Sequence, residues 1–347
     1  MVYDINQLLK NALTNNASDL HLTVNSPPVY RINGRLTVED EELLTPEHTE
    51  KMARQLIPDE DWNRFMKEKE MDFSYSLKDI SRYRVHVFYR QQHISIVIRV
   101  IPKNIPTLDD LNMPEVLKQL VLKPQGMIIV TGPTGSGKST TLSAMINYIN
   151  QYEAKHIITL EDPIEYEHRH QKSIINQREV GVDTNSFHTG IRAALRQDPD
   201  IILVGEMRDL ETMETAITAA ETGHLVLATL HTSNAVETIN RIIGVFPPNQ
   251  QLQIRNQLAS VLNGVISQRL IPTADKSGRK AATEILLNLP SVANLIRNEK
   301  VEQISNIMQT SRAQGMHTLE MSIRDLINKN EIDPVSAEIY LTDAGEN

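Results

Sequence analysis

A glycine-rich octapeptide near the middle of this 347-residue chain constrains its fold more than any other feature. It reads Gly132-Pro133-Thr134-Gly135-Ser136-Gly137-Lys138-Ser139, followed by Thr140, and fits the spacing G-x-x-x-x-G-K-[ST]. The glycines allow backbone N–H groups to curl around phosphates, and a following helix directs its positive N-terminus at them. We expect Lys138 to contact the β- and γ-phosphates of a nucleotide and the Ser139 hydroxyl to hold Mg²⁺. An apolar strand pattern precedes the octapeptide and a helical one follows, so the sequence predicts a phosphate-binding loop rather than a chance turn.

Short apolar runs alternate with longer helical patterns around this loop. The expected strands are Met127 to Thr131, His156 to Leu160, Ile201 to Val204, Leu225 to Leu230 and Ala281 to Leu287. The expected helices include Ser139 to Asn150, Phe187 to Arg196 and Leu210 to Thr222. Continuous apolar strands separated by helices are typical of a mostly parallel sheet that is covered on both faces. Beyond Pro290 only helical patterns remain, which predicts a helical end to the chain.

The first hundred residues have a different, α+β pattern. Met1 to Leu13 places apolar residues at helical spacing, and later segments alternate apolar and polar residues as half-buried strands do. Asn33-Gly34 predicts a hairpin turn, and Ile101 to Pro106 contains two prolines, as a linker does. We therefore expect an N-terminal domain at 1–100, a linker at 101–107, an α/β domain at 108–290 and a helical region at 291–347.

Composition excludes several classes of protein. Asp plus Glu outnumber Lys plus Arg by 44 to 35, a net charge of −9, which argues against a protein that coats nucleic acid. The chain has no cysteine, so disulfides, thiolate zinc sites and a cysteine nucleophile are excluded. Nowhere do ~18 apolar residues run together, so we expect no direct insertion into a membrane.

One predicted strand ends in a carboxylate of the kind that supports nucleotide hydrolysis. Ile201 to Val204 leads through Gly205 to Glu206, as in a Walker B strand, with glycine in place of the usual aspartate. Such a strand end lies beside the phosphate loop in an open α/β sheet. We therefore expect Mg²⁺ to be held by Ser139 and waters, with Glu206 acting through a water.

A second strand tip carries Glu161, Asp162 and Glu165, and two histidines, His224 and His231, flank another strand. Three carboxylates so close together cost too much to bury unpaired, so they are either solvated or arranged around a metal–phosphate centre. A lone histidine is more often structural than catalytic. Two histidines at opposite ends of one strand cannot both face one nucleotide.

Basic residues gather in the N-terminal domain despite the acidic balance of the chain. The segment from Ile80 to Leu108 has no acidic residue and five basic ones, namely Arg82, Arg84, Arg90, Arg99 and Lys103. A solvated strand face is the usual setting for such side chains. Guanidinium groups also match phosphate oxygens, so a phosphate clamp is the functional alternative.

Longer motifs resemble the secretion-ATPase superfamily. The run from Gly190 to Asp200, continuing through Glu206 to Arg208-Asp209, is one of them. Thr159 to Glu165 and Thr222 to Thr232 are similar to its Asp box and His box. Within the superfamily the chain resembles type IV pilus retraction ATPases nearly end to end, from the motif Ala17-Ser18-Asp19-Leu20-His21-Leu22 to Gly315-Met316-His317-Thr318-Leu319.

The resemblance implies both a fold and an activity. The fold is α/β: an N-terminal PAS-like α+β domain followed by a RecA-like P-loop ATPase domain with a helical C-terminal tail. The activity is hydrolysis of ATP, with Mg²⁺, by a homohexamer that powers pilus retraction, meaning pilin disassembly and twitching motility. The implied partners are an inner-membrane pilus platform protein and, indirectly, pilin, with no nucleic acid. The implied location is cytoplasmic, peripheral at the inner face of the cell membrane at the pilus base.

The resemblance also implies roles for individual residues. Glu165 is the catalytic carboxylate, and the N-terminal domain presents Arg84 and Arg99 to the nucleotide. We expect His224 and His231 to connect the nucleotide state to the subunit interface rather than bind a metal, because they lack zinc-site spacing.

One departure and three alternatives remain. Retraction ATPases usually carry Ala-Ile-Arg-Asn-Leu-Ile-Arg-Glu near the C-terminus, and Ala293 stands at the first arginine of that motif here. A pilus-assembly, type II secretion or competence-type ATPase would use the same chemistry, although many of these carry a four-cysteine zinc module. A nucleic-acid translocase is disfavoured by the net charge. A non-hydrolysing regulatory partner is disfavoured by intact Lys138, Glu165 and Glu206.

Overall fold

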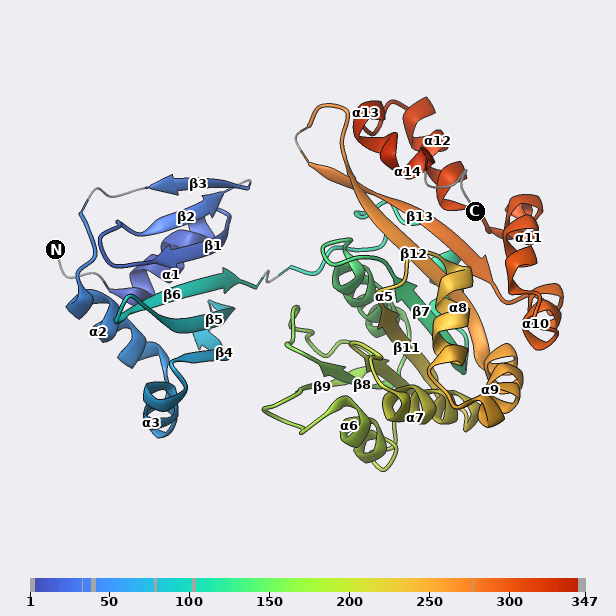
Figure 1. Cartoon of the computed structure of the whole chain (residues 1–347), viewed down its shortest axis with the longest axis horizontal. Coiled ribbons are helices and arrows are strands. Elements are labelled where there is room, and N and C mark those ends of the chain that lie inside the picture. Colours follow the sequence, from blue (N-terminus) through green and yellow to red (C-terminus); the bar gives the residue numbers. More distant parts are fainter. Residues whose placement is uncertain are drawn as a thin grey trace. The chain divides into compact units, whose positions relative to one another are not determined.

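The computed structural model describes residues 4–32, 34–38, 42–77, 80–101, 104–276 and 278–342. The chain divides into two compact units, Met1–Asn104 and Ile105–Asn347, and the division falls inside the segment expected to be a linker. Pro102 and Lys103 of that segment lie outside the described residues, as does Asn33 of the expected hairpin turn. Figure 1 shows the elements of each unit, which we describe separately.

The first unit is a six-stranded antiparallel sheet in the order β3-β2-β1-β6-β5-β4 (Figure 1). The strands are β1 (Ala17–Leu22), β2 (Val29–Ile32), β3 (Arg35–Val38), β4 (Glu70–Leu77), β5 (Ser81–Arg90) and β6 (His93–Val100). Strands β2 and β3 pair with Ile32 opposite Arg35. The helices are α1 (Ile5–Thr14), α2 (Pro46–Leu56) and α3 (Asp59–Glu68).

Residue alternation gives this sheet one apolar and one polar face. Leu20, Val85 and Ile98 are fully buried in the core that the helices share with the sheet. In each strand, the residues directly before and after these buried ones point to the opposite face, because successive side chains of a strand alternate. Asp19, Arg84 and Arg99 therefore lie together on the polar face, in cross-strand register.

The second unit is a seven-stranded sheet in the order β13-β12-β7-β11-β10-β8-β9. Its strands are β7 (Gly126–Thr131), β8 (His156–Glu161), β9 (Ile174–Glu179), β10 (Ile201–Val204), β11 (Leu225–Leu230), β12 (Leu262–Pro272) and β13 (Arg279–Leu287). All neighbours pair in parallel except β12 and β13, which are antiparallel. The sequence predicted five of these strands and missed β9 and β12.

Helices cover both faces of this sheet, as the apolar strands predicted (Figure 1). One face packs on α4 (Val116–Val121) and α5 (Lys138–Tyr152). The other packs on α6 (Phe187–Ala194), α7 (Leu210–Glu221), α8 (Ala235–Gly244) and α9 (Pro248–Val261). None of the described helices is both long enough and apolar enough to cross a membrane.

The end of the chain is helical and packs on the same unit. It comprises α10 (Pro290–Arg297), α11 (Ile304–Thr310), α12 (Leu319–Asn328), α13 (Pro334–Ala337) and α14 (Ile339–Thr342), with two 3₁₀ turns at Val301–Gln303 and Arg312–Gln314. Helix α12 packs on β13, where Ile323 joins Ala282 in a small apolar cluster. Ala293 is buried in α10, against the main core of the unit.

A buried carboxylate, Glu284 on β13, fixes the starts of two helices. One of its oxygens accepts a hydrogen bond from the Ala235 amide at 2.7 Å, and the Leu319 amide also donates to the carboxyl group. Ala235 and Leu319 are the first residues of α8 and α12. Burial raises the pKa of Glu284, while these amides act in the opposite direction. A negative group at two positive helix ends offsets part of the cost of burying it.

We expect Glu284→Ala to lower the free energy of unfolding by about 2–4 kcal/mol, because two buried amides lose their acceptor. Glu284→Gln keeps an acceptor oxygen of similar shape and should cost less than half as much. Urea unfolding measures both, with Glu302→Ala at an exposed position as the control. Wild-type stability in Glu284→Ala would show that the two helix ends do not depend on this carboxylate.

Candidate nucleotide-binding site

The phosphate loop lies between β7 and α5, where the sequence placed it. Gly132, Gly135 and Gly137 have positive φ angles of 143°, 78° and 89°. A Cβ on Gly132 would lie 2.5 Å from the Gln268 carbonyl oxygen, and one on Gly137 would lie 2.8 Å from the Gln268 amide nitrogen. Only glycine fits these two positions.

The loop has the properties of an anion site. No side chain caps the N-terminus of α5, so its first amides are available to phosphate oxygens. The Ser136 hydroxyl is buried inside the loop and makes no hydrogen bond within the described structure. An unsatisfied buried hydroxyl next to free amides fits a bound phosphate group.

Lys138 folds back over this loop. Its Nζ donates to the carbonyl oxygens of Gly132 at 2.8 Å and Pro133 at 3.1 Å, and lies 3.4 Å from Nδ1 of His231. Burial lowers the pKa of Lys138, while attraction to Glu206 and Glu165 acts in the opposite direction. The partners of the ammonium group in the loop are thus neutral carbonyl oxygens. Charged phosphate oxygens can replace them, because they form stronger hydrogen bonds with an ammonium group.

His231 connects Lys138 to the Walker B carboxylate. Its Nε2 lies 3.2 Å from one Glu206 oxygen, and Nη2 of Arg208 lies 2.7 Å from the other. A neutral imidazole that carries its proton on Nε2 satisfies both contacts, since Nδ1 then accepts from Lys138. Burial raises the pKa of Glu206, but the hydrogen bonds from Arg208 and His231 and the charge of Arg208 outweigh burial and hold that pKa below its ordinary value.

The structure separates the three Asp-box carboxylates. The carboxylate of Glu161 is already hydrogen-bonded within the protein. Thr159 donates to it at 2.6 Å, Gln177 donates at 3.1 Å, and the Glu165 backbone also donates. Burial raises the pKa of Glu161. Asp162 and Glu165 are exposed. Glu161 therefore shapes the loop, and Glu165 is the carboxylate that is open to solvent near Lys138.

The two histidines lie at opposite ends of strand β11. His231 follows the C-terminal end of β11 and reaches the phosphate loop. His224 precedes the same strand, and its Nδ1 lies 3.0 Å from the Ala219 carbonyl oxygen and 3.3 Å from the Thr222 hydroxyl. Because β11 runs parallel to β7, His224 lies at the edge away from the phosphate loop.

Sequence reasoning missed Gln268, a buried residue of β12 that braces the loop. Its amide nitrogen donates to the Ser136 carbonyl at 2.7 Å, and its oxygen accepts from the Thr141 hydroxyl at 2.9 Å. The signal was the polar run Ser267-Gln268-Arg269 between the apolar pairs Val265-Ile266 and Leu270-Ile271. Polar side chains in a buried strand need partners, and here the partners belong to the phosphate loop and α5.

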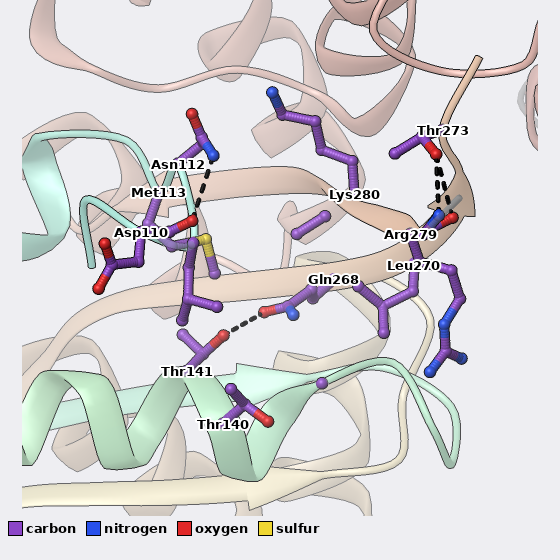
Figure 2. A pocket seen from close by; sticks show the side chains of 14 residues that line it. Asp110, Asn112, Met113, Thr140, Thr141, Gln268, Leu270, Thr273, Arg279 and Lys280 are labelled. Carbon is purple, nitrogen blue, oxygen red and sulfur yellow. Dashed lines mark hydrogen bonds between the residues drawn. The ribbon is translucent and has the colours of Figure 1, made fainter. Parts of the chain in front are cut away.

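A cavity of about 600 Å³ adjoins the first turn of α5 (Figure 2). Figure 2 shows Thr141 and Gln268 directed toward each other, with Met113 and Leu270 also lining the space. The complete lining comprises Asp110, Leu111, Asn112, Met113, Gly137, Thr140, Thr141, Gln268, Leu270, Thr273, Gly278, Arg279, Lys280 and Ala281. Its size and mixed lining suit a small organic group attached to phosphates. Four separate stretches of chain build it, so no local motif predicts it.

The two predicted arginines lie in the first unit, directly opposite each other on β5 and β6. Arg99 Nε lies 3.0 Å from an Asp19 oxygen. Arg84 Nε lies 3.8 Å from an Asp72 oxygen. Both guanidinium groups are substantially exposed, as a phosphate-binding pair requires.

No cluster of three or more histidine or acidic side chains suited to a metal ion occurs in the described part of the chain. Mg²⁺ at a phosphate loop needs no such cluster, because it takes one or two protein ligands together with waters and phosphate oxygens. The Ser139 hydroxyl at the start of α5 fits this limited demand.

A phosphate loop on a seven-stranded sheet, with carboxylates at neighbouring strand ends, defines a RecA-like P-loop ATPase. Residues 1–339 match the Type II/IV secretion system protein family, and the chain belongs to this family. The family includes the secretion and retraction ATPases, so the resemblance inferred from the sequence motifs is confirmed.

Several relatives match nearly the whole chain. The type IV pilus retraction ATPase PilT of Pseudomonas aeruginosa is 44% identical over 334 residues, which cover 96% of this chain and 97% of PilT. A twitching motility protein of Neisseria gonorrhoeae is 42% identical over 337 residues, 97% of this chain and 90% of that protein.

Solved structures confirm the fold class. A crystal structure of the pilus retraction motor PilT with bound ADP has a TM-score of 0.90 and 44% identity, and the match covers 96% of both chains. The Legionella pneumophila ATPase DotB has a TM-score of 0.83 and 26% identity, over 98% of this chain and 95% of DotB. The fold is an N-terminal PAS-like α+β domain and a RecA-like P-loop ATPase domain with a helical C-terminal tail.

We expect Gln268→Ala to weaken binding of ADP about tenfold or more, because the loop loses its hydrogen bond at Ser136 and the first turn of α5 loses the one at Thr141. Gln251→Ala is the matched control, since the Gln251 amide nitrogen also donates to a backbone carbonyl, that of Phe246, far from the loop in sequence. Titration calorimetry with ADP measures both variants. Unchanged affinity in a folded Gln268→Ala variant would contradict the bracing role.

Proposed function

We propose that this chain is a motor ATPase that hydrolyses ATP, with Mg²⁺, to power type IV pilus retraction as a homohexamer. The observation that carries the proposal is the 44% identity to a retraction ATPase over 96% of this chain and 97% of that protein. The phosphate loop, Glu165 and Glu206 all lie within residues 1–339, the range that matches the family. The proposed domains are 1–100, a linker at 101–107, 108–290 and a helical region at 291–347.

The phosphate loop binds the triphosphate, and the adjoining cavity holds the base and ribose. When phosphate oxygens arrive, Lys138 exchanges the Gly132 and Pro133 carbonyls for the β- and γ-phosphates. The Ser139 hydroxyl would hold Mg²⁺, which neutralises phosphate charge when it is bound, and Glu206 would act on it through a water.

Glu165 then serves as the base. Its carboxylate takes a proton from a water whose oxygen attacks the γ-phosphorus, while the bond from that phosphorus to the β-phosphate oxygen breaks. ADP and phosphate are the products. Glu161 keeps the Glu165 backbone in place, and the exposed position of Glu165 leaves its oxygens free for the water.

The proposed partners are an inner-membrane platform protein and, indirectly, pilin, and the proposed location is the cytoplasmic face of the membrane at the pilus base. Deletion of the gene in its host separates retraction from assembly. Accumulation of surface pili indicates retraction, and their absence indicates assembly. Stimulation of ATPase activity by single-stranded or duplex DNA would instead favour a nucleic-acid translocase.

We expect Glu165→Gln to bind ATP normally and to lose hydrolysis by about 10²–10⁴-fold, the usual contribution of a positioned base. Lys138→Ala should weaken ATP binding as well, because Lys138 contacts the phosphates in the ground state. Steady-state ATPase assays and equilibrium binding separate the two effects. The control is Glu167→Gln, at an exposed carboxylate two residues further on. Near-normal hydrolysis in Glu165→Gln would move the base to Glu206 or Glu161.

We also expect Arg99→Ala to lower kcat for ATP hydrolysis by about 10³–10⁵-fold, the contribution of an arginine that contacts the transferred phosphoryl group. Arg84→Ala should be impaired to a smaller extent. Arg90→Ala, on the same strand as Arg84, is the control. If the arginines act on the nucleotide of a neighbouring subunit, mixing Arg99→Ala with Lys138→Ala subunits restores part of the activity. Mixed rings that show only the average of their parents, after verified subunit exchange, would place the arginine in cis.

A further inference from the structure

Asp19, on the polar face of the first unit, forms an ion pair with Arg99. Strands β1 and β6 pair with Asp19 directly opposite Arg99. The Asp19 side chain is only 11% exposed, whereas that of Arg99 is 66% exposed. A nearly buried carboxylate thus sits at the base of an arginine whose end reaches solvent.

The carboxylate is held in place from several sides. Arg99 Nε donates to Oδ1 at 3.0 Å, and the Ser18 hydroxyl donates to Oδ2 at 2.8 Å. Arg31 Nε, on β2, lies 3.9 Å from Oδ2. Both oxygens are therefore engaged, and Asp19 cannot follow Arg99 if the arginine moves toward a ligand.

Asp19 engages Arg99 at one nitrogen of its guanidinium. Among the described residues, the ion pair of Arg99 runs through Nε, and the side chain as a whole is 66% exposed, so the two η nitrogens are not used in this ion pair. The guanidinium is planar, so one fixed hydrogen bond at Nε restricts both its plane and its direction. The η fork matches two phosphate oxygens.

We propose that Asp19 is a positioning residue that orients Arg99 for contact with the phosphates. The inference rests on the proposed role of Arg99 in hydrolysis. Ordering the side chain in the folded protein means that less conformational entropy is lost when the phosphates are engaged. Asp19 itself touches neither the nucleotide nor the reacting water.

Arg84 offers a contrast within the same sheet. Its partner, Asp72, lies 3.8 Å from Nε, and the Asp72 side chain is 55% exposed. Asp72 also contacts Nδ1 of His86 at 3.1 Å, so it is shared. Arg84 is thus held more loosely than Arg99, which agrees with the smaller loss of activity expected for Arg84→Ala.

The test measures ATPase kinetics of Asp19→Asn, Arg99→Ala and the double variant in the full-length chain. We expect Asp19→Asn to lower kcat about 10–100-fold, because the amide lacks the charge that attracts the guanidinium and its oxygen accepts a weaker hydrogen bond from Arg99 Nε. KM for ATP should change little, because the loop and cavity are intact. In the Arg99→Ala background, Asp19→Asn should cause no further loss, since its effect passes through Arg99. Asp61→Asn, at a partly exposed carboxylate that pairs with Arg64 in α3, is the control.

Each contrary outcome has a distinct meaning. Wild-type kcat in Asp19→Asn, or an additive loss in the double variant, overturns the positioning role. A lower KM with undiminished kcat also overturns it, because Asp19 would then compete with phosphate for Arg99. If Arg99→Ala is itself fully active, the proposed role of Arg99 fails instead. Should thermal unfolding show that Asp19→Asn does not fold, Asp19→Glu repeats the test with the charge kept and the carboxylate displaced, and the same outcomes apply.

Discussion

The hydrogen bonds between Gln268 and the phosphate loop set the shape on which the rest of the site depends. A phosphate loop must leave its own amides unpaired for the ligand, so it cannot be held by an internal ladder of hydrogen bonds. Here β12 supplies the support from outside, through Ser136 and Thr141 on either side of Lys138. Its backbone also approaches Gly132 so closely that no side chain fits there. The register of β12 against β7 is therefore as important to nucleotide binding as the loop sequence.

The sequence predicted those parts of the fold whose signal is local. Strands β7, β8, β10 and β11 are continuous apolar runs, and their predicted bounds agree with the structure to within a residue. Strand β12 was missed because it follows α9 without a turn, at the junction of Val261 and Leu262. Strand β9 was missed because it is an edge strand with a polar second half, so it lacks both the length and the apolar pattern of a central strand.

The same distinction applies to the site. The sequence predicted that Glu206 lies near Lys138, because a parallel sheet brings such strand ends to one edge, and in the structure Glu206 lies within electrostatic reach of Lys138. Without the resemblance, residue spacing could not rank the Asp-box carboxylates, because part of the difference arises from Gln177 on the missed strand β9, which donates a hydrogen bond to Glu161. Residue type also could not show which of the two histidines, His231 or His224, meets the phosphate loop. Their positions at opposite ends of β11 decide which one meets the phosphate loop.

A continuous set of contacts leads from the phosphate loop to the C-terminal helices. Lys138 contacts His231, and the segment after His231 enters α8, whose first amide is held by Glu284. The same carboxylate accepts from the first amide of α12. In the proposed mechanism Lys138 leaves the loop carbonyls for phosphate oxygens, so His231 would lose its contact with Lys138 and keep its contact with Glu206. Because one buried carboxylate serves both helix ends, α8 cannot shift its first turn without breaking a buried hydrogen bond or moving α12 with it. These contacts, together with the chain segment between His231 and α8, thus join the phosphate loop to the first turns of α8 and α12.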